Sequence, residues 1–80
     1  MKVQYRGKNW GGLTDGSIYD VIEYEEWPGA LRIVDNSKED YLYHPKKPGP
    51  IAGPNRGTAY GYFEIIEDDE YGTLQKAICD

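Results

Sequence analysis

The chain has 80 residues, of which 39% are hydrophobic and 29% are charged, and its formal net charge is −5. This length predicts a single domain, 1–80, and the eight Tyr and two Trp exclude the aromatic-poor composition of a disordered protein. The negative charge argues against general nucleic-acid binding, and the lone cysteine, Cys79, excludes an internal disulfide framework and a Cys-based zinc cage.

The chain also lacks the signals of a membrane or secreted protein. No apolar run approaches the roughly 18 residues of a membrane span, and the first ten residues lack the apolar stretch of a secretory signal. We therefore expect a cytoplasmic protein, in its own cell or in an infected host, with no membrane partner.

The first half of the chain predicts three strands. Residues 2–6 form the first, and a glycine-rich connection follows over 7–17. Residues 18–26 form the second strand, in which the adjacent Val21 and Ile22 break the alternation and indicate a bulge or burial on both faces. The turn "EWPG" then leads into a third strand over 30–35.

The second half predicts two more strands and a tail. The segment "DNSKED" fits a polar hairpin turn better than a calcium loop, because it lacks the turn glycine and the distal Glu. Residues 40–43 and 60–67 form the fourth and fifth strands. The acidic run 67–71 predicts a solvated end, and the tail is either a short helix or a final strand. Five short strands with a long first connection predict an all-β protein, a small barrel.

Three segments, "GLTDGSIYDVIEYEE", "LRIVDNSKEDYLY" and "FEIIE", resemble a group of small bacterial and phage proteins with a Src-homology-3-like barrel. The resemblance covers most of residues 11–43 and 63–67, and it implies a five-stranded barrel of that type. The chain departs from the pattern at Lys38, where a turn glycine is usual, and between "DYLY" and "FEIIE", where a normally brief connection has nineteen residues. The Pro/Gly-rich basic loop 44–61 is therefore predicted to be an insertion before the last core strand.

The inserted loop carries the opposite charge to the rest of the chain. It contains three basic residues and no Asp or Glu, which leaves six basic against fourteen acidic residues, or −8, in the remainder. Glycine-rich turns can direct backbone amides at an anion, Arg can grip a phosphate with two hydrogen bonds, and aromatic rings can stack on a base. The candidate ligand-binding residues are Tyr43, His44, Lys46, Lys47, Arg56, Thr58, Tyr60, Tyr62, Trp10 and Trp27.

We expect a non-enzymatic binding protein with no cofactor and no metal. The sequence contains no nucleotide-binding or hydrolytic motif, and Cys79 lies far along the chain from the only histidine, His44. The expected ligand is a small anion, and the resemblance to phage proteins implies a cyclic dinucleotide or oligonucleotide immune signal that the protein sequesters. Adjacent Ile65 and Ile66 predict a homo-oligomer, because one of the two side chains should face away from the core.

Two alternatives stay open at this point. The loop could be a solvated connection whose lysines only maintain solubility. Alternatively, the protein could be a peptide- or protein-binding module, such as an immunity protein that masks a basic partner. In that case the acidic Glu25, Glu26 and Asp40, together with Trp27, would carry the binding.

Overall fold

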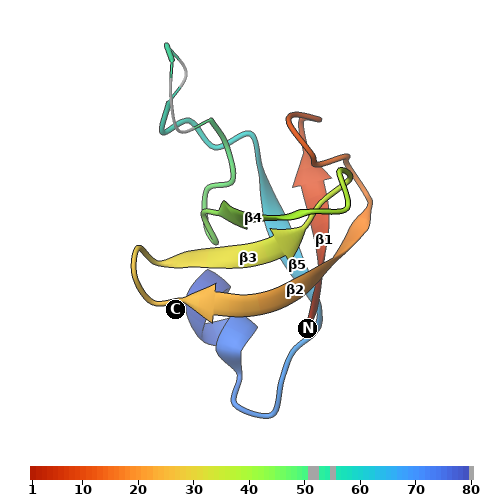
Figure 1. The fold of residues 1–80 in the computed structure, drawn as a ribbon, viewed down its shortest axis with the longest axis vertical. Helices are drawn as coiled ribbons and strands as arrows, with labels where there is room; N and C mark the ends of the chain where they lie inside the picture. Colours follow the sequence, from red (N-terminus) through yellow and green to blue (C-terminus); the bar gives the residue numbers. More distant parts are fainter. Residues whose placement is uncertain (51–52, 55, 80) are drawn as a thin grey trace.

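The computed structural model describes residues 1–50, 53–54 and 56–79, and it shows one five-stranded antiparallel sheet (Figure 1). The strand order is β4-β3-β2-β1-β5. The strands are β1 (Lys2–Gly7), β2 (Ile18–Glu25), β3 (Ala30–Val34), β4 (Asp40–Tyr43) and β5 (Gly61–Glu67). The predicted all-β class is confirmed, and every strand boundary lies within one residue of its expected position.

The core lies on one face of the sheet. Side chains alternate along β1, where Val3 and Tyr5 are fully buried, and along β3, where Leu31 and Ile33 are fully buried. This is the period of two that a strand with one buried face requires. The core cluster consists of Val3, Tyr5, Leu13, Tyr19, Val21, Leu31, Ile33, Tyr43, Phe63, Leu74 and Ala77.

Two bulges interrupt the strand pairing, and the extra residue at each bulge is an exposed isoleucine. Between β2 and β3 the register moves from Val21 to Glu23, so Ile22 is the extra residue of a bulge, which was one of the two arrangements that the sequence pattern indicated. Between β1 and β5 a similar shift makes Ile66 the extra residue. Ile22 is 53% exposed and Ile66 is 46% exposed. In both strands the first of the two adjacent apolar residues therefore packs in or against the core, and the second is exposed.

The sheet curls, but its strand ladder is not closed. Among the described residues, β4 and β5 form the two ends of the strand order and do not pair with each other. Their side chains nevertheless meet, since the ring centroids of Tyr43 on β4 and Phe63 on β5 lie 6.5 Å apart. The expected all-β sheet is thus present, whereas the expected closure into a barrel is not confirmed.

The tail is helical rather than a final strand. Thr73 and Leu74 begin a short helical segment that continues as the π-helix η1 (Gln75–Cys79), and Leu74 is fully buried in the core. The carboxylate of Asp68 accepts hydrogen bonds from the amides of Leu74 and Gln75, at 2.8 and 3.0 Å. The start of the acidic run therefore caps this helical segment and is not simply a solvated end. In the described part of the chain, no helix has the length and apolarity that a membrane crossing requires.

Candidate functional site

The inserted loop folds back on itself through backbone contacts. The amide of Tyr60 donates to the carbonyl of Pro48 at 2.9 Å, and the amide of Gly57 donates to the carbonyl of Pro50 at 3.0 Å. The two legs approach closely only because residue 49 is glycine, since a Cβ there would lie 1.9 Å from the carbonyl oxygen of Thr58. Ile51, Ala52 and Asn55, which belong to the predicted loop, lie outside the described residues.

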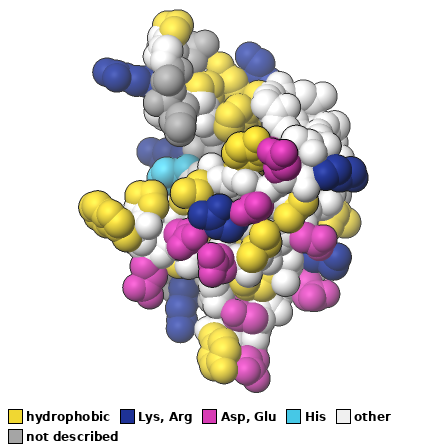
Figure 2. All heavy atoms as spheres, in the orientation of Figure 1, with side chains coloured by type: hydrophobic (Ala, Val, Ile, Leu, Met, Phe, Trp, Pro, Cys, Tyr) yellow, Lys and Arg dark blue, Asp and Glu magenta, His cyan; other side chains and the backbone are white. Residues whose placement is uncertain are grey.

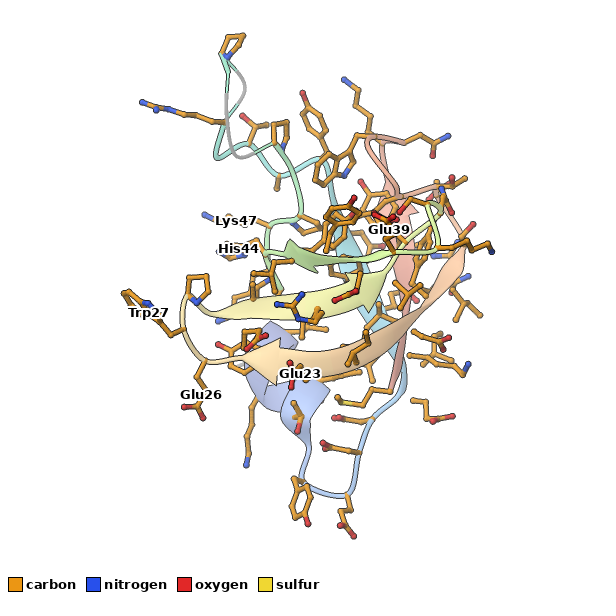
Figure 3. All side chains as sticks on the ribbon, in the orientation of Figure 1. Glu23, Glu26, Trp27, Glu39, His44 and Lys47 are labelled. Carbon is orange, nitrogen blue, oxygen red and sulfur yellow. The ribbon has the colours of Figure 1, made fainter. Side chains whose placement is uncertain are left out.

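His44 shapes the first turn of the loop. Its Nδ1 accepts hydrogen bonds from the amides of Lys46, at 3.1 Å, and Lys47, at 3.0 Å. An imidazole nitrogen that accepts two N–H groups carries no proton, so in the neutral ring Nε2 is the nitrogen that donates. His44 therefore fixes the position of Lys47 and keeps a donor available for a ligand. The two side chains lie next to each other at the start of the loop (Figure 3).

An open hollow of about 530 Å³ lies between the legs of the loop. It is lined by His44, Lys47, Gly49, Pro50, Arg56 and Gly57. These residues include two basic side chains and one histidine, and none of them is acidic. Figure 2 shows the histidine beside a basic side chain at the base of the loop. The volume lies within the range of roughly 300–1,000 Å³ that small-molecule sites occupy.

The structure brings together only part of the predicted site. His44, Lys47 and Arg56 line one hollow, as the loop hypothesis requires. Lys46 and Thr58 are exposed in the same loop but are not among the lining residues. Gly49, Pro50 and Gly57 were not singled out by the sequence, although the clustering of glycine and proline in the loop could have indicated them.

The predicted aromatic platform does not form at the hollow. Tyr43 is only 8% exposed, and its hydroxyl donates to Oδ2 of Asp35 at 2.6 Å, so its role as a stacking surface was wrongly assigned. The rings of Trp10 and Tyr60 pack edge to face, and the Lys8 ammonium lies 4.5 Å from the Tyr60 centroid. Neither of these two rings lines the hollow.

The two remaining aromatic candidates are exposed elsewhere. Tyr62 lies on β5, and Trp27 projects from the turn between β2 and β3 with 91% of its surface exposed. In Figure 3 Trp27 points away from the sheet and from the loop. The sequence identified these side chains as aromatic and accessible, but it could not show that they belong to surfaces other than the hollow.

The buried carboxylate of Asp35, which directly follows β3, is held by the Tyr43 hydroxyl of β4. Burial of Asp35 would raise its pKa, but hydrogen bonds from Ser37 and from the Tyr43 hydroxyl outweigh this effect and hold the pKa below its usual value. Burial and the neighbouring Asp35 raise the pKa of Tyr43, which keeps its hydroxyl protonated as a donor. Asp35 and Tyr43 therefore form a structural pair and do not open into the hollow.

Other chemistry has little support in the described residues. They contain no group of three or more His, Cys, Asp or Glu side chains placed to hold a metal ion. Cys79 is a free, exposed thiol in η1. The basic hollow differs from two other pockets in the described residues, because each of those is lined by both acidic and basic side chains.

Comparison of the chain with protein-family models, with curated proteins and with solved structures found no match.

Proposed function

We propose that the protein binds a small, phosphate-bearing anion in the basic hollow and does not turn it over. The observation that carries this proposal is the presence of His44, Lys47 and Arg56 around one hollow whose described lining has no carboxylate. Arg can offer two parallel N–H donors to a phosphate, while Lys supplies a point charge. The amides of the glycine-rich turns are further donors of the kind that bind anions.

Phosphate recognition has more support than base recognition. The aromatic candidates lie outside the hollow, so the lining offers cations and backbone but no stacked platform. A cyclic dinucleotide, which carries two phosphates, is the ligand that we propose, because the resemblance to phage proteins implies sequestration of such a signal. In that role the protein needs affinity for its ligand and requires neither a cofactor nor a catalytic group.

We also propose that the sheet belongs to the Src-homology-3-like type. The strand order β4-β3-β2-β1-β5 and the contact between Tyr43 and Phe63 support a sheet that curls until its end strands approach through their side chains. A long insertion before the last strand fits such a scaffold, since surface loops tolerate added length at a small entropic cost.

The proposal is tested by titrating the protein with a cyclic dinucleotide and, separately, with inorganic phosphate, by calorimetry and thermal shift. Binding to the folded state should raise the melting temperature. Arg56→Ala should reduce the binding free energy by about 1.5–3 kcal/mol, a loss of roughly 10- to 150-fold in affinity, if Arg56 makes a charged hydrogen bond to the phosphate. Lys47→Glu should also weaken binding, and affinity should fall as salt increases.

Lys76→Glu is the matched control, because it makes the same charge change at an exposed lysine in η1. It should leave binding unchanged. Equal losses in Lys47→Glu and Lys76→Glu would show that only the overall charge matters and would overturn the hollow as the site. Recovery of a hydrolysed dinucleotide would overturn the non-enzymatic part of the proposal.

A further inference from the structure

A second surface lies on the side of the sheet that faces away from the core. We define the outer face as the outward side chains of the three strands β2, β3 and β4. These are Ile18, Asp20, Ile22, Glu23, Glu25, Arg32, Val34, Asp40 and Leu42. In the pairing register Arg32 lies opposite Glu23 on one side and Leu42 on the other. The outer face therefore has an ionic centre with apolar neighbours.

Carboxylates dominate the centre of the outer face. The guanidinium of Arg32 contacts Asp40 at 2.8 Å, Glu25 at 3.0 Å and Glu23 at 3.8 Å. One positive charge thus meets three negative ones, and Glu26 adds another in the adjoining turn. Figure 2 shows this arrangement as a basic side chain surrounded by acidic ones. The local excess of negative charge remains available to a cationic partner.

Exposed apolar side chains flank this acidic centre. Ile22 is the extra residue of the β2 bulge, is 53% exposed, and directly precedes Glu23. Leu42 is 42% exposed on the edge strand β4, opposite Arg32. Trp27 extends from the turn that joins β2 to β3. Single exposed apolar residues are ordinary, but two that flank one ionic cluster form a small mixed surface.

We propose that the outer face docks a basic, partly apolar surface of another protein. Lys or Arg side chains of the partner would meet the carboxylates around Arg32, while its apolar side chains would cover Ile22 and Leu42. Trp27 would act as an aromatic anchor at the end of the interface, a role in which Trp is enriched. The same face of a second copy does not fit, because it would place carboxylates against carboxylates.

A designed peptide tests this docking surface on the full chain. The probe is an extended peptide of Lys, Arg and Leu. It is compared with one version that has Glu at every basic position and another that has Ser at every Leu position. The proposal expects the first peptide to bind best and to shift the amide resonances of β2, β3 and β4. Shifts confined to other parts of the protein, or equal binding of all three peptides, would overturn it.

Substitutions then separate the outer face from the rest of the surface. Binding of the basic peptide should weaken about tenfold, or by about 1.4 kcal/mol, in each of three variants: Glu23→Lys, Ile22→Ser and Trp27→Ala. Trp27 is so exposed that its loss should leave the fold intact. Tyr71→Ser is the control, since Tyr71 is an exposed aromatic side chain outside the outer face. Wild-type affinity in all three of these variants would refute the proposal.

The Lys47→Glu variant distinguishes peptide binding on the outer face from anion binding in the hollow. The hollow and the outer face carry opposite charges and share no residue. Lys47→Glu should therefore leave peptide binding at least as strong as in the wild type, while it weakens binding of the anion. If it instead abolished peptide binding, the outer face would not be the docking surface.

Discussion

Lys38 has a backbone conformation that is unfavourable for the folded state. It has a φ of +72°, and it is the one residue other than glycine with a positive φ in the described part of the chain. The left-handed region is unfavourable for a side chain with a Cβ and costs about 1–2 kcal/mol. Lys38 lies in the segment "DNSKED", which was predicted to be a polar hairpin turn.

Lys38→Gly should stabilise the protein. The gain from relieving the left-handed conformation exceeds the entropy that glycine adds to the unfolded chain, and the expected net gain is about 0.5–1 kcal/mol. Urea denaturation measures this change. Lys38→Ala is the control, since it removes the charge but keeps the Cβ. An equal gain in both variants would attribute the effect to the lysine side chain and not to φ.

The sequence could not assign every residue to its correct environment. Along the four residues of β4 only Tyr43 is buried, so the strand is too short to reveal an inward face by alternation. Tyr43 therefore looked like an accessible ring, although it belongs to the core. That Lys47 and Arg56 line one hollow was likewise not visible from spacing, because it depends on backbone contacts between the two legs of the loop.

At the level of elements, strands were easier to predict than the tail. Each strand contains β-branched or aromatic residues and is followed by turn signals, and the adjacent Val21 and Ile22 indicated a bulge or burial on both faces of β2. The tail has only a few helical residues and therefore no clear period. What determines its fold is the cap, in which Asp68 and Asp69 accept amide hydrogen bonds from the residues that follow.

Asp68→Ala should loosen the helical tail. Partial burial opposes ionisation of Asp68, but hydrogen bonds from the amides of Leu74 and Gln75 outweigh it and lower its pKa. Without this carboxylate both amides lose their acceptor, and they should exchange with deuterium faster. Glu70→Ala is the control, since Glu70 is an exposed member of the same acidic run. Unchanged exchange in Asp68→Ala, or an equal change in the control, would contradict the capping role.

The same cap sets a direction for the effect of pH. A carboxylate whose folded pKa is lowered stabilises the fold fully above its unfolded pKa of about 3.9. That contribution is lost as pH falls through the lower folded value. Amide protection at Leu74 and Gln75 should therefore decline on acidification in the wild type, whereas in Asp68→Ala this decline should be absent at those two amides.

At the scale of the whole molecule, the two signs of charge occupy different surfaces. The basic residues of the hollow belong to the inserted loop, and the carboxylates around Arg32 belong to β2, β3 and β4. The charge count of the loop predicted this division. The sequence could not place the acidic residues on a common face, because that requires the register between the strands.

The surface of β5 lies apart from both sites and is where we expect self-association. Within the described residues β5 pairs only with β1, so its other edge has no strand partner. Ile66 is exposed there while Ile65 is partly buried against the core, and this separation of the two side chains is what their adjacency predicted. An unpaired strand edge with an exposed isoleucine favours pairing with a second copy about a two-fold axis.

Light scattering should therefore give a mass near twice the 9.1 kDa of the chain at concentrations of tens of micromolar. Ile66→Asp should return the protein to a monomer, because it places a charge in the contact. Ile22→Asp makes the same change at the other bulge, on the outer face, and should leave the dimer intact. A monomeric wild type would refute the assembly. A dimer that Ile22→Asp dissociates and Ile66→Asp does not would instead assign self-association to the outer face, which its excess of carboxylates opposes.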